Sequence, residues 1–186
     1  MPGADAILRD QEGRSVLRFE RTLRHPPERV WRALTDASEL ASWHPTPFDL
    51  DPRARTVSYR PEGDVPDMPA GEITEYDPPR LLAHRWGDDE LRWELAPQGD
   101  GSLLVLTHTF ADRFKAARDA AGWHLCLDAL TASLDDRSTA LSERFLARSR
   151  GGEPPDGTTG EWRELNAAYQ ERFGIAPEEA TPPPEP

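Results

Sequence analysis

The feature that most constrains this fold is a change of hydrophobic period after Phe110. Before it, apolar and polar residues alternate in short stretches, as in half-buried β-strands. After it, from Asp112 to Leu134, apolar residues recur with the spacing of one helix face. The pattern predicts a set of strands followed by one long helix. The expected strands are Ser15–Leu23, Thr56–Arg60, Gly71–Asp77, Leu81–Gly87, Glu90–Ala96 and Ser102–Phe110.

Turn residues separate the later strands by gaps of hairpin length. Pro78-Pro79, Gly87–Asp89 and Gln98–Gly101 are too short for a helical crossover, so these strands are expected to pair antiparallel. Two short helices are expected between the first two strands. One begins at Pro27, and the other runs from Asp36 to Trp43 with Asp36 or Ser38 as its cap.

The remaining sequence predicts one main domain with appendages. Residues 1–13 are expected to be a flexible leader, residues 14–150 the folded domain and residues 151–160 a linker rich in Gly and Pro. Residues 161–174 are predicted to form an appended helix, and residues 175–186 a disordered tail. The appended helix could fold back on its own domain or cross to a second subunit, so a homodimer is left open.

Charge and cysteine content exclude several classes of partner. The chain has 22 basic and 34 acidic residues and a net charge of -12, which disfavours binding to nucleic acid or to an anionic membrane. Cys126 is the single cysteine, so no internal disulfide or thiolate metal cluster can form. The sequence has no signal peptide and no apolar run of the roughly 20 residues that a membrane span needs. We therefore expect a cytoplasmic protein, with a composition typical of bacteria.

Six short motifs occur in a fixed order along the chain. Together they resemble the START-like SRPBCC superfamily, in the branch of homologues of the C-terminal domain of the heat-shock-protein ATPase activator. The resemblance covers Arg14 to Leu134 and implies an α+β helix-grip fold, in which a curved antiparallel sheet wraps a long C-terminal helix and leaves a cavity between them. The motifs are HPPERVWRALTD (25–36), DPPRLL (77–82), RWGD (85–88), LRWEL (91–95), LTHTF (106–110) and AGWH (121–124).

Strand alternation selects the candidate site. Leu82, His84 and Trp86 share one strand face, as do the sets around Trp93 and His108, and we expect these faces to meet the long helix beside Trp123. Aromatic walls with a few polar groups are typical of small-molecule sites. The alternative is that these side chains form ordinary core. The predicted ligand-binding residues are Trp43, His84, Trp86, Trp93, His108 and Trp123.

Three functions remain open. The first is binding of a small apolar molecule, with no cofactor, no metal and no catalytic residues. The second is a polyketide cyclase or dehydratase-like enzyme that uses His108, with Glu75 on the Ile73 face of its strand; the alternative for Glu75 is an ion pair with an arginine. The third, implied by the resemblance, is an interaction module that regulates a chaperone ATPase. A chaperone partner is doubtful, because the eukaryotic co-chaperone has a separate N-terminal domain for which this chain is expected to have no room.

Overall fold

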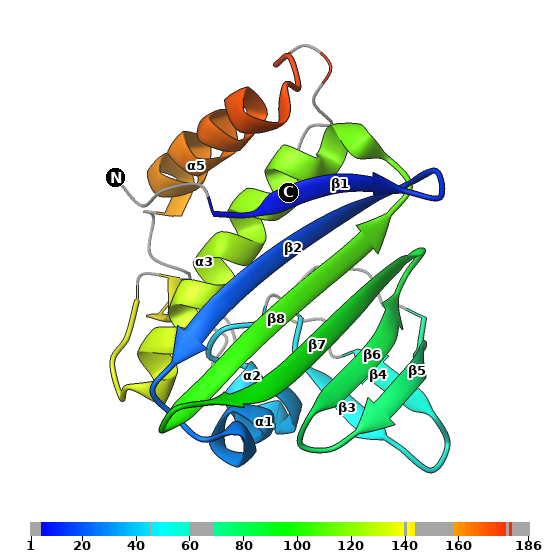
Figure 1. Cartoon of the computed structure of the whole chain (residues 1–186), viewed down its shortest axis with the longest axis vertical. Helices are drawn as coiled ribbons and strands as arrows, with labels where there is room; N and C mark the ends of the chain where they lie inside the picture. The colour runs from blue at the N-terminus through cyan, green and yellow to red at the C-terminus, as the bar shows by residue number, and fades with distance from the viewer. Residues whose placement is uncertain are drawn as a thin grey trace.

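Eight strands of the computed structural model form one antiparallel sheet (Figure 1). The model describes residues 5–44, 46–59, 69–139, 141–143, 158–177 and 179. The strand order is β1-β2-β8-β7-β6-β5-β4-β3, so β8 lies between β2 and β7 and pairs with both along its length. The strands are β1 (Ile7–Gln11), β2 (Arg14–Leu23), β3 (Phe48–Asp51), β4 (Thr56–Tyr59), β5 (Gly71–Asp77), β6 (Leu81–Trp86), β7 (Asp89–Gln98) and β8 (Gly101–Phe110).

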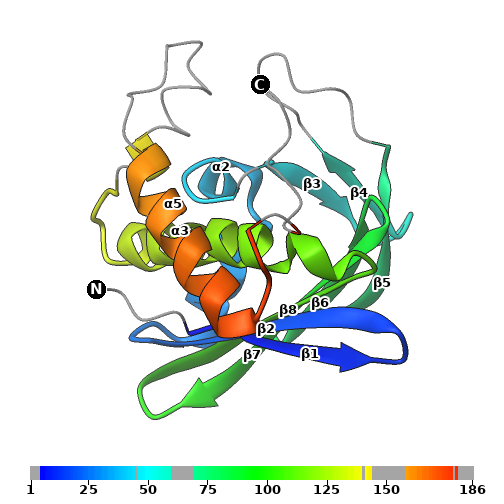
Figure 2. The same cartoon turned by 90° about the horizontal axis from the view of Figure 1, so that it is seen from above.

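The helices lie on the concave side of the sheet (Figure 2). The long helix α3 (Ala116–Leu134) follows a short 3-10 turn, η1 (Arg113–Lys115), and the sheet curls around it. Helices α1 (Pro27–Thr35) and α2 (Ala37–Leu40) lie near one end of the sheet, and α5 (Thr158–Phe173) lies near the other (Figure 1). This α+β arrangement confirms the predicted helix-grip fold.

Proline and aspartate set the boundaries of the two short helices. Pro27 occupies the first turn of α1, where its missing N–H costs nothing. The side chain of Asp36 accepts hydrogen bonds from the backbone N–H groups of Ser38 and Glu39 and so caps α2, as the sequence predicts. Hydrogen bonds from Ser38 hold the pKa of Asp36 below its ordinary value. Trp43 lies beyond α2, which ends earlier than expected.

The strand register builds the inner face row by row. One row runs Leu17, His108, Leu91, His84 and Ile73 across β2, β8, β7, β6 and β5. All five side chains are buried. The alternation in the sequence therefore predicts the inner face of these strands correctly, and it places two histidines in one row.

Near the ends of the domain, the structure differs from what local sequence signals predict. Residues 1–13 are not wholly a flexible leader, because Ile7–Gln11 form β1 and pair with β2. The strand β3 was not predicted, and Phe114 is exposed although the helical period placed it on the buried stripe. The helix α5 begins at Thr158, inside the expected linker, and Ile175 of the expected tail is buried. Most of the expected linker and tail lie outside the described residues.

The appended helix folds back onto its own domain. Tyr169 of α5 is fully buried, and its hydroxyl lies 2.9 Å from Nδ1 of His124 on α3 and 3.2 Å from a carboxylate oxygen of Asp5. The ring of His124 is buried and contacts the ring of Tyr169. Burial raises the pKa of Tyr169 to about 12, which keeps its hydroxyl protonated. None of the helices in the described part of the chain is long and apolar enough to cross a membrane.

Gly101 offers a direct test of the β2–β8 pairing. A Cβ at this position would overlap the carbonyl oxygen of Leu23, a backbone atom that cannot turn away. We expect Gly101→Ala to lower the free energy of unfolding by about 2–4 kcal/mol. In the matched control Gly122→Ala, the new Cβ meets no atom within 4 Å inside α3. That control is expected to stabilise by about 0.5–1 kcal/mol in the same urea titration, and equal effects of the two substitutions would contradict the assigned packing.

Candidate functional site

A layer of aromatic rings lies between the inner face of the sheet and α3. The rings come from the loop after α2, from β3, β4, β6, β7 and β8, and from α3. We call this set the aromatic layer. Its members are Trp43, His44, Phe48, Tyr59, His84, Trp86, Trp93, His108, Phe110 and Trp123.

Trp93 of β7 contacts two other tryptophans edge to face, one in the loop after α2 and one on α3. Trp93 lies between Trp43 and Trp123, with ring centroids 5.6 Å apart in both pairs. The ring centroid of Trp86 lies 5.6 Å from that of Trp123 and 6.0 Å from that of His108. The structure thus brings all six predicted ligand-binding residues together. Trp86 is the one among them that keeps partial solvent access.

His84 is fully buried, and its hydrogen bonds determine which ring nitrogen carries the proton. The Tyr59 hydroxyl donates its one proton to the backbone carbonyl of Arg85. Its oxygen lies 3.0 Å from Nδ1 of His84, so it accepts from that nitrogen. The same Nδ1 also lies 3.3 Å from the Arg85 carbonyl, which can only accept. Nδ1 is therefore the protonated nitrogen of His84, and Nε2 carries a bare lone pair.

His44, in the loop after α2, is also buried. Its Nδ1 lies 2.8 Å from the carbonyl oxygen of Thr46 and 3.2 Å from the Thr46 amide nitrogen. The Thr46 carbonyl can only accept and the Thr46 N–H can only donate, so the two contacts call for opposite tautomers. The shorter contact favours a proton on Nδ1, which leaves Nε2 unprotonated. The ring lies 5.1 Å from Phe48 and 6.3 Å from Trp86, measured between centroids.

Three polar atoms of the layer are buried without a hydrogen-bond partner among the described residues. They are Nε2 of His44, Nε2 of His84 and Nε1 of Trp86. Both histidine rings contact Phe48, and Trp86 contacts His44, so the three groups belong to one neighbourhood. A buried polar group without a partner costs about 1–3 kcal/mol, and such groups are few in native proteins. The rings of the layer therefore contact one another, but three of its polar atoms lack a hydrogen-bond partner among the described residues.

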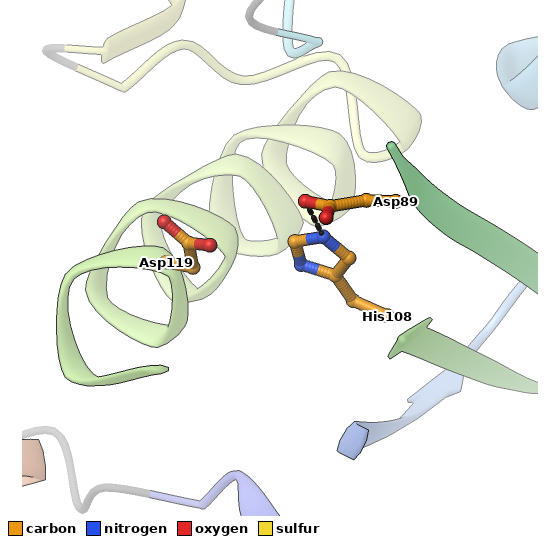
Figure 3. A group of neighbouring side chains, drawn as sticks. All are labelled: Asp89, His108 and Asp119. Atoms are coloured by element: carbon orange, nitrogen blue, oxygen red, sulfur yellow. Dashed lines mark hydrogen bonds and ion pairs between the residues drawn. The ribbon is translucent and has the colours of Figure 1, made fainter. Parts of the chain in front are cut away.

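His108 differs from these two histidines because both of its nitrogens are bonded. Trp123 Nε1 donates to Nδ1 at 3.1 Å, so Nε2 carries the proton and donates to Asp89 at 2.9 Å (Figure 3). Lys115 Nζ binds the same Asp89 oxygen at 2.5 Å. Burial alone would raise the pKa of Asp89, but the hydrogen bonds from His108 and Lys115 outweigh it and lower the pKa.

Asp89, His108 and Asp119 are the one group of three or more metal-ligating side chains in the described part of the chain (Figure 3). Their ligand atoms lie within 4.8 Å of one another. The Lys115 ammonium already lies between the two carboxylates, 2.5 Å from Asp89 and 3.7 Å from Asp119. With both nitrogens of His108 bonded and a resident cation in place, these residues do not fit a metal ion.

The placement of Glu75 inside the cavity is wrong. A β-bulge shifts the register of β5, so that Ile73 pairs with His84 whereas Glu75 pairs with Ala83. The bulge turns Glu75 to the outer face, where it is exposed and forms an ion pair with Arg92. The arginine pair, the alternative that the sequence offered, is correct. Glu75 therefore cannot assist a histidine inside the layer.

Sequence reasoning missed Phe48 and Tyr59 as members of the layer. Tyr59 lies in a predicted strand, but its role depends on the position of its hydroxyl beside His84, which no local pattern encodes. Phe48 lies in β3, which is only four residues long and follows a proline-rich loop. The repeated aromatic and histidine residues between positions 43 and 48 were the available signal.

The two incompletely bonded histidines predict loss of stability on mild acidification. Burial, with a smaller effect of the neighbouring His84, lowers the pKa of His44 to about 3, and burial lowers that of His84 to about 4, both from 6.5. The unfolded chain therefore binds more protons than the folded chain as the pH falls through 6.5, and the free energy of unfolding decreases. We expect a loss of about 2 kcal/mol per histidine by pH 5.

Urea titrations at pH 7, 6 and 5 measure this loss. The double variant His44→Phe, His84→Phe should show a flatter pH profile than the wild type, because its folded and unfolded states no longer differ in protonation at these positions. A wild-type profile as flat as that of the double variant contradicts the assignment of neutral, buried rings.

Comparison with known proteins agrees with this fold. Residues 24–135 match the family model described as Activator of Hsp90 ATPase homolog 1-like protein. Among solved structures, the chain is similar to CalU16 from Micromonospora echinospora, at 21% identity and a TM-score of 0.66 over 91% of this chain and 97% of that chain. It is also similar to EF2215, a conserved protein of unknown function from Enterococcus faecalis, at 18% identity and a TM-score of 0.65 over 91% and 90% of the two chains. A comparison with curated proteins gives no match.

The structural neighbours support the fold, and the family model supports the membership. The matched region begins just before α1 and ends just after α3, so it contains β3 to β8 and all ten members of the aromatic layer. The resemblance noted from the six motifs is thereby confirmed: the chain belongs to the family of Activator of Hsp90 ATPase homolog 1-like proteins.

Proposed function

We propose that this protein binds a small, largely apolar molecule at the aromatic layer. The observation that carries the proposal is the group of three buried, unpaired polar atoms on His44, His84 and Trp86. Rings of the layer offer apolar contact on several sides, and the unpaired atoms offer fixed hydrogen-bonding positions. This combination of many apolar contacts with few polar ones is how small-molecule sites are built.

Energetics favour an occupant over an empty layer. Each unpaired polar atom costs about 1–3 kcal/mol while it stays buried, and a ligand that pairs with it removes this cost. The ligand must reach the layer from solvent, and Trp86 is the partly accessible tryptophan of the set. We therefore place the entry beside Trp86, at the β6–β7 turn.

The bonding of His108 and the position of Glu75 favour binding over catalysis. A general base needs a free lone pair within reach of its substrate. Nδ1 of His108 accepts from Trp123 and Nε2 donates to Asp89, and Glu75 lies on the outer face. The cyclase-like alternative thus has no supporting observation at these two residues. The outer face around Arg92 carries ion pairs to Glu75 and Glu94, which gives no support to an apolar docking surface for a chaperone there.

A neutral fluorescent probe tests the proposal. N-phenyl-1-naphthylamine should bind to the full-length protein, with a blue-shifted probe emission and quenched tryptophan emission. Trp86→Leu should weaken this binding by about tenfold, the effect of losing roughly 1.4 kcal/mol of contact. Trp31→Phe is the matched control, because Trp31 contacts Tyr76 and has no ring contact with the layer among the described residues.

Two outcomes oppose the proposal. One is the absence of probe binding to the wild-type protein. The other is an equal loss of affinity in the Trp86 and Trp31 variants, which would place the probe elsewhere or show nonspecific binding. Native mass spectrometry of the same preparation, before and after denaturation, then shows whether a noncovalent molecule is already bound.

A further inference from the structure

The unpaired atoms of the aromatic layer have defined hydrogen-bonding roles. His84 uses its ring proton at Nδ1, where Tyr59 Oη and the Arg85 carbonyl accept it, so its Nε2 can only accept. In His44 the shorter Nδ1 contact, to the Thr46 carbonyl, assigns the ring proton to Nδ1, so its Nε2 is a second acceptor. The indole N–H of Trp86 is a donor and cannot accept. The layer thus presents two acceptors and one donor, all buried.

The layer also carries no net charge. Both histidine rings are neutral, because each has one ring proton and a buried Nε2 without a partner. Asp89 and Lys115, which meet the layer at His108, form an ion pair with each other. A carboxylate or an ammonium ion moved from water into this site would lose its hydration and find no opposite charge. The occupant is therefore neutral.

We propose that the occupant is an uncharged aromatic alcohol, a phenol-type molecule whose hydroxyl hydrogen is donated to Nε2 of His44 or His84 and whose oxygen accepts from Trp86 Nε1. This inference rests on the proposed function and adds the chemical class of the ligand. A hydroxyl group combines one donor with two acceptor lone pairs, which complements an imidazole lone pair and an indole N–H at once. An aromatic skeleton suits the surrounding rings, which already contact each other edge to face.

Other occupants match the same atoms less well. An ether or a hydrocarbon leaves both histidine acceptors unpaired. Histidines that bind a metal through one ring nitrogen commonly donate from the other to a carbonyl, as His44 and His84 do. The described residues, however, place no third metal ligand beside these two histidines. Water alone could pair with the polar atoms, and it would do so without the contribution of the rings.

Three small probes of matched shape test the ligand class on the full-length, 15N-labelled protein. Phenol offers a donor and an acceptor, anisole an acceptor alone, and benzoate a negative charge. We expect phenol to bind about tenfold more tightly than anisole, the effect of one net hydrogen bond. Benzoate should bind more weakly than phenol. The indole N–H signal of Trp86, assigned with Trp86→Phe, should move downfield with phenol as it gains an acceptor.

A variant separates the hydrogen bond from the apolar contact. His84→Phe keeps a ring at this position and removes Nε2, so it should reduce the affinity for phenol and leave that for anisole nearly unchanged. Trp31→Phe should change neither affinity. If His84→Phe does not fold, the ring 15N shifts of the wild type provide the second test, because they distinguish a protonated nitrogen from a bare one. They should show a bare Nε2 in His84 that responds to phenol.

The outcomes separate this inference from the proposed function. Equal binding of phenol and anisole overturns the phenol class and leaves apolar binding intact. Tighter binding of benzoate overturns the neutral site. A response of both Nε2 atoms to Zn²⁺ at stoichiometric concentration, with none to phenol, replaces the ligand by a metal. If none of the probes binds and N-phenyl-1-naphthylamine also fails to bind, the proposed function is wrong as well.

Discussion

The packing of the inner face of the sheet against α3 is the interaction on which the rest of the structure depends. The strand β8 pairs along its length with β2 and β7, and its inner residues Leu104, Leu106, His108 and Phe110 are all buried. The helix α3 supplies Trp123 to the same layer, and six of its alanines are buried. Edge-to-face ring pairs of this kind contribute about 0.5–1.5 kcal/mol each beyond area burial. The same side chains therefore form both the hydrophobic core and the candidate site.

Much of this layer can be predicted from the sequence, because strand alternation and helix period are local signals. Leu91, Trp93 and Leu95 fall on one face of β7 by simple alternation, and the structure buries all three. Asp36 caps α2 as its residue type predicts. The hairpin gaps fix the antiparallel order of β5 to β8, since each is too short for a crossover. The role of the six predicted residues in ligand binding remains a prediction.

What sequence reasoning missed depends on contacts between distant parts of the chain. One extra residue in β5 makes the bulge that turns Glu75 outward, and no local signal separates this from regular alternation. His44 and His124 are polar residues that Phe48 and Tyr169 cover in space, and no local pattern predicts this burial. The strand β1 is held through its pairing with β2, and the hydroxyl of Tyr169 lies beside the adjoining Asp5. Each of these positions is set by a partner that lies far away in the chain or in another element.

The chemistry of the layer argues for a selected function. Replacing His44 and His84 by phenylalanine would keep rings in both places and remove two unpaired polar atoms, and by the usual cost of such atoms the core would gain stability. A core under selection for stability alone has no use for these nitrogens. The contrast with His108 is informative, because that ring lies in the same row as His84 and has both nitrogens bonded. The fold can therefore satisfy a histidine on this face, and two of the three in the layer are nevertheless left with a free lone pair. Polar groups kept unpaired at a stability cost are typical of sites whose partner arrives from outside the chain.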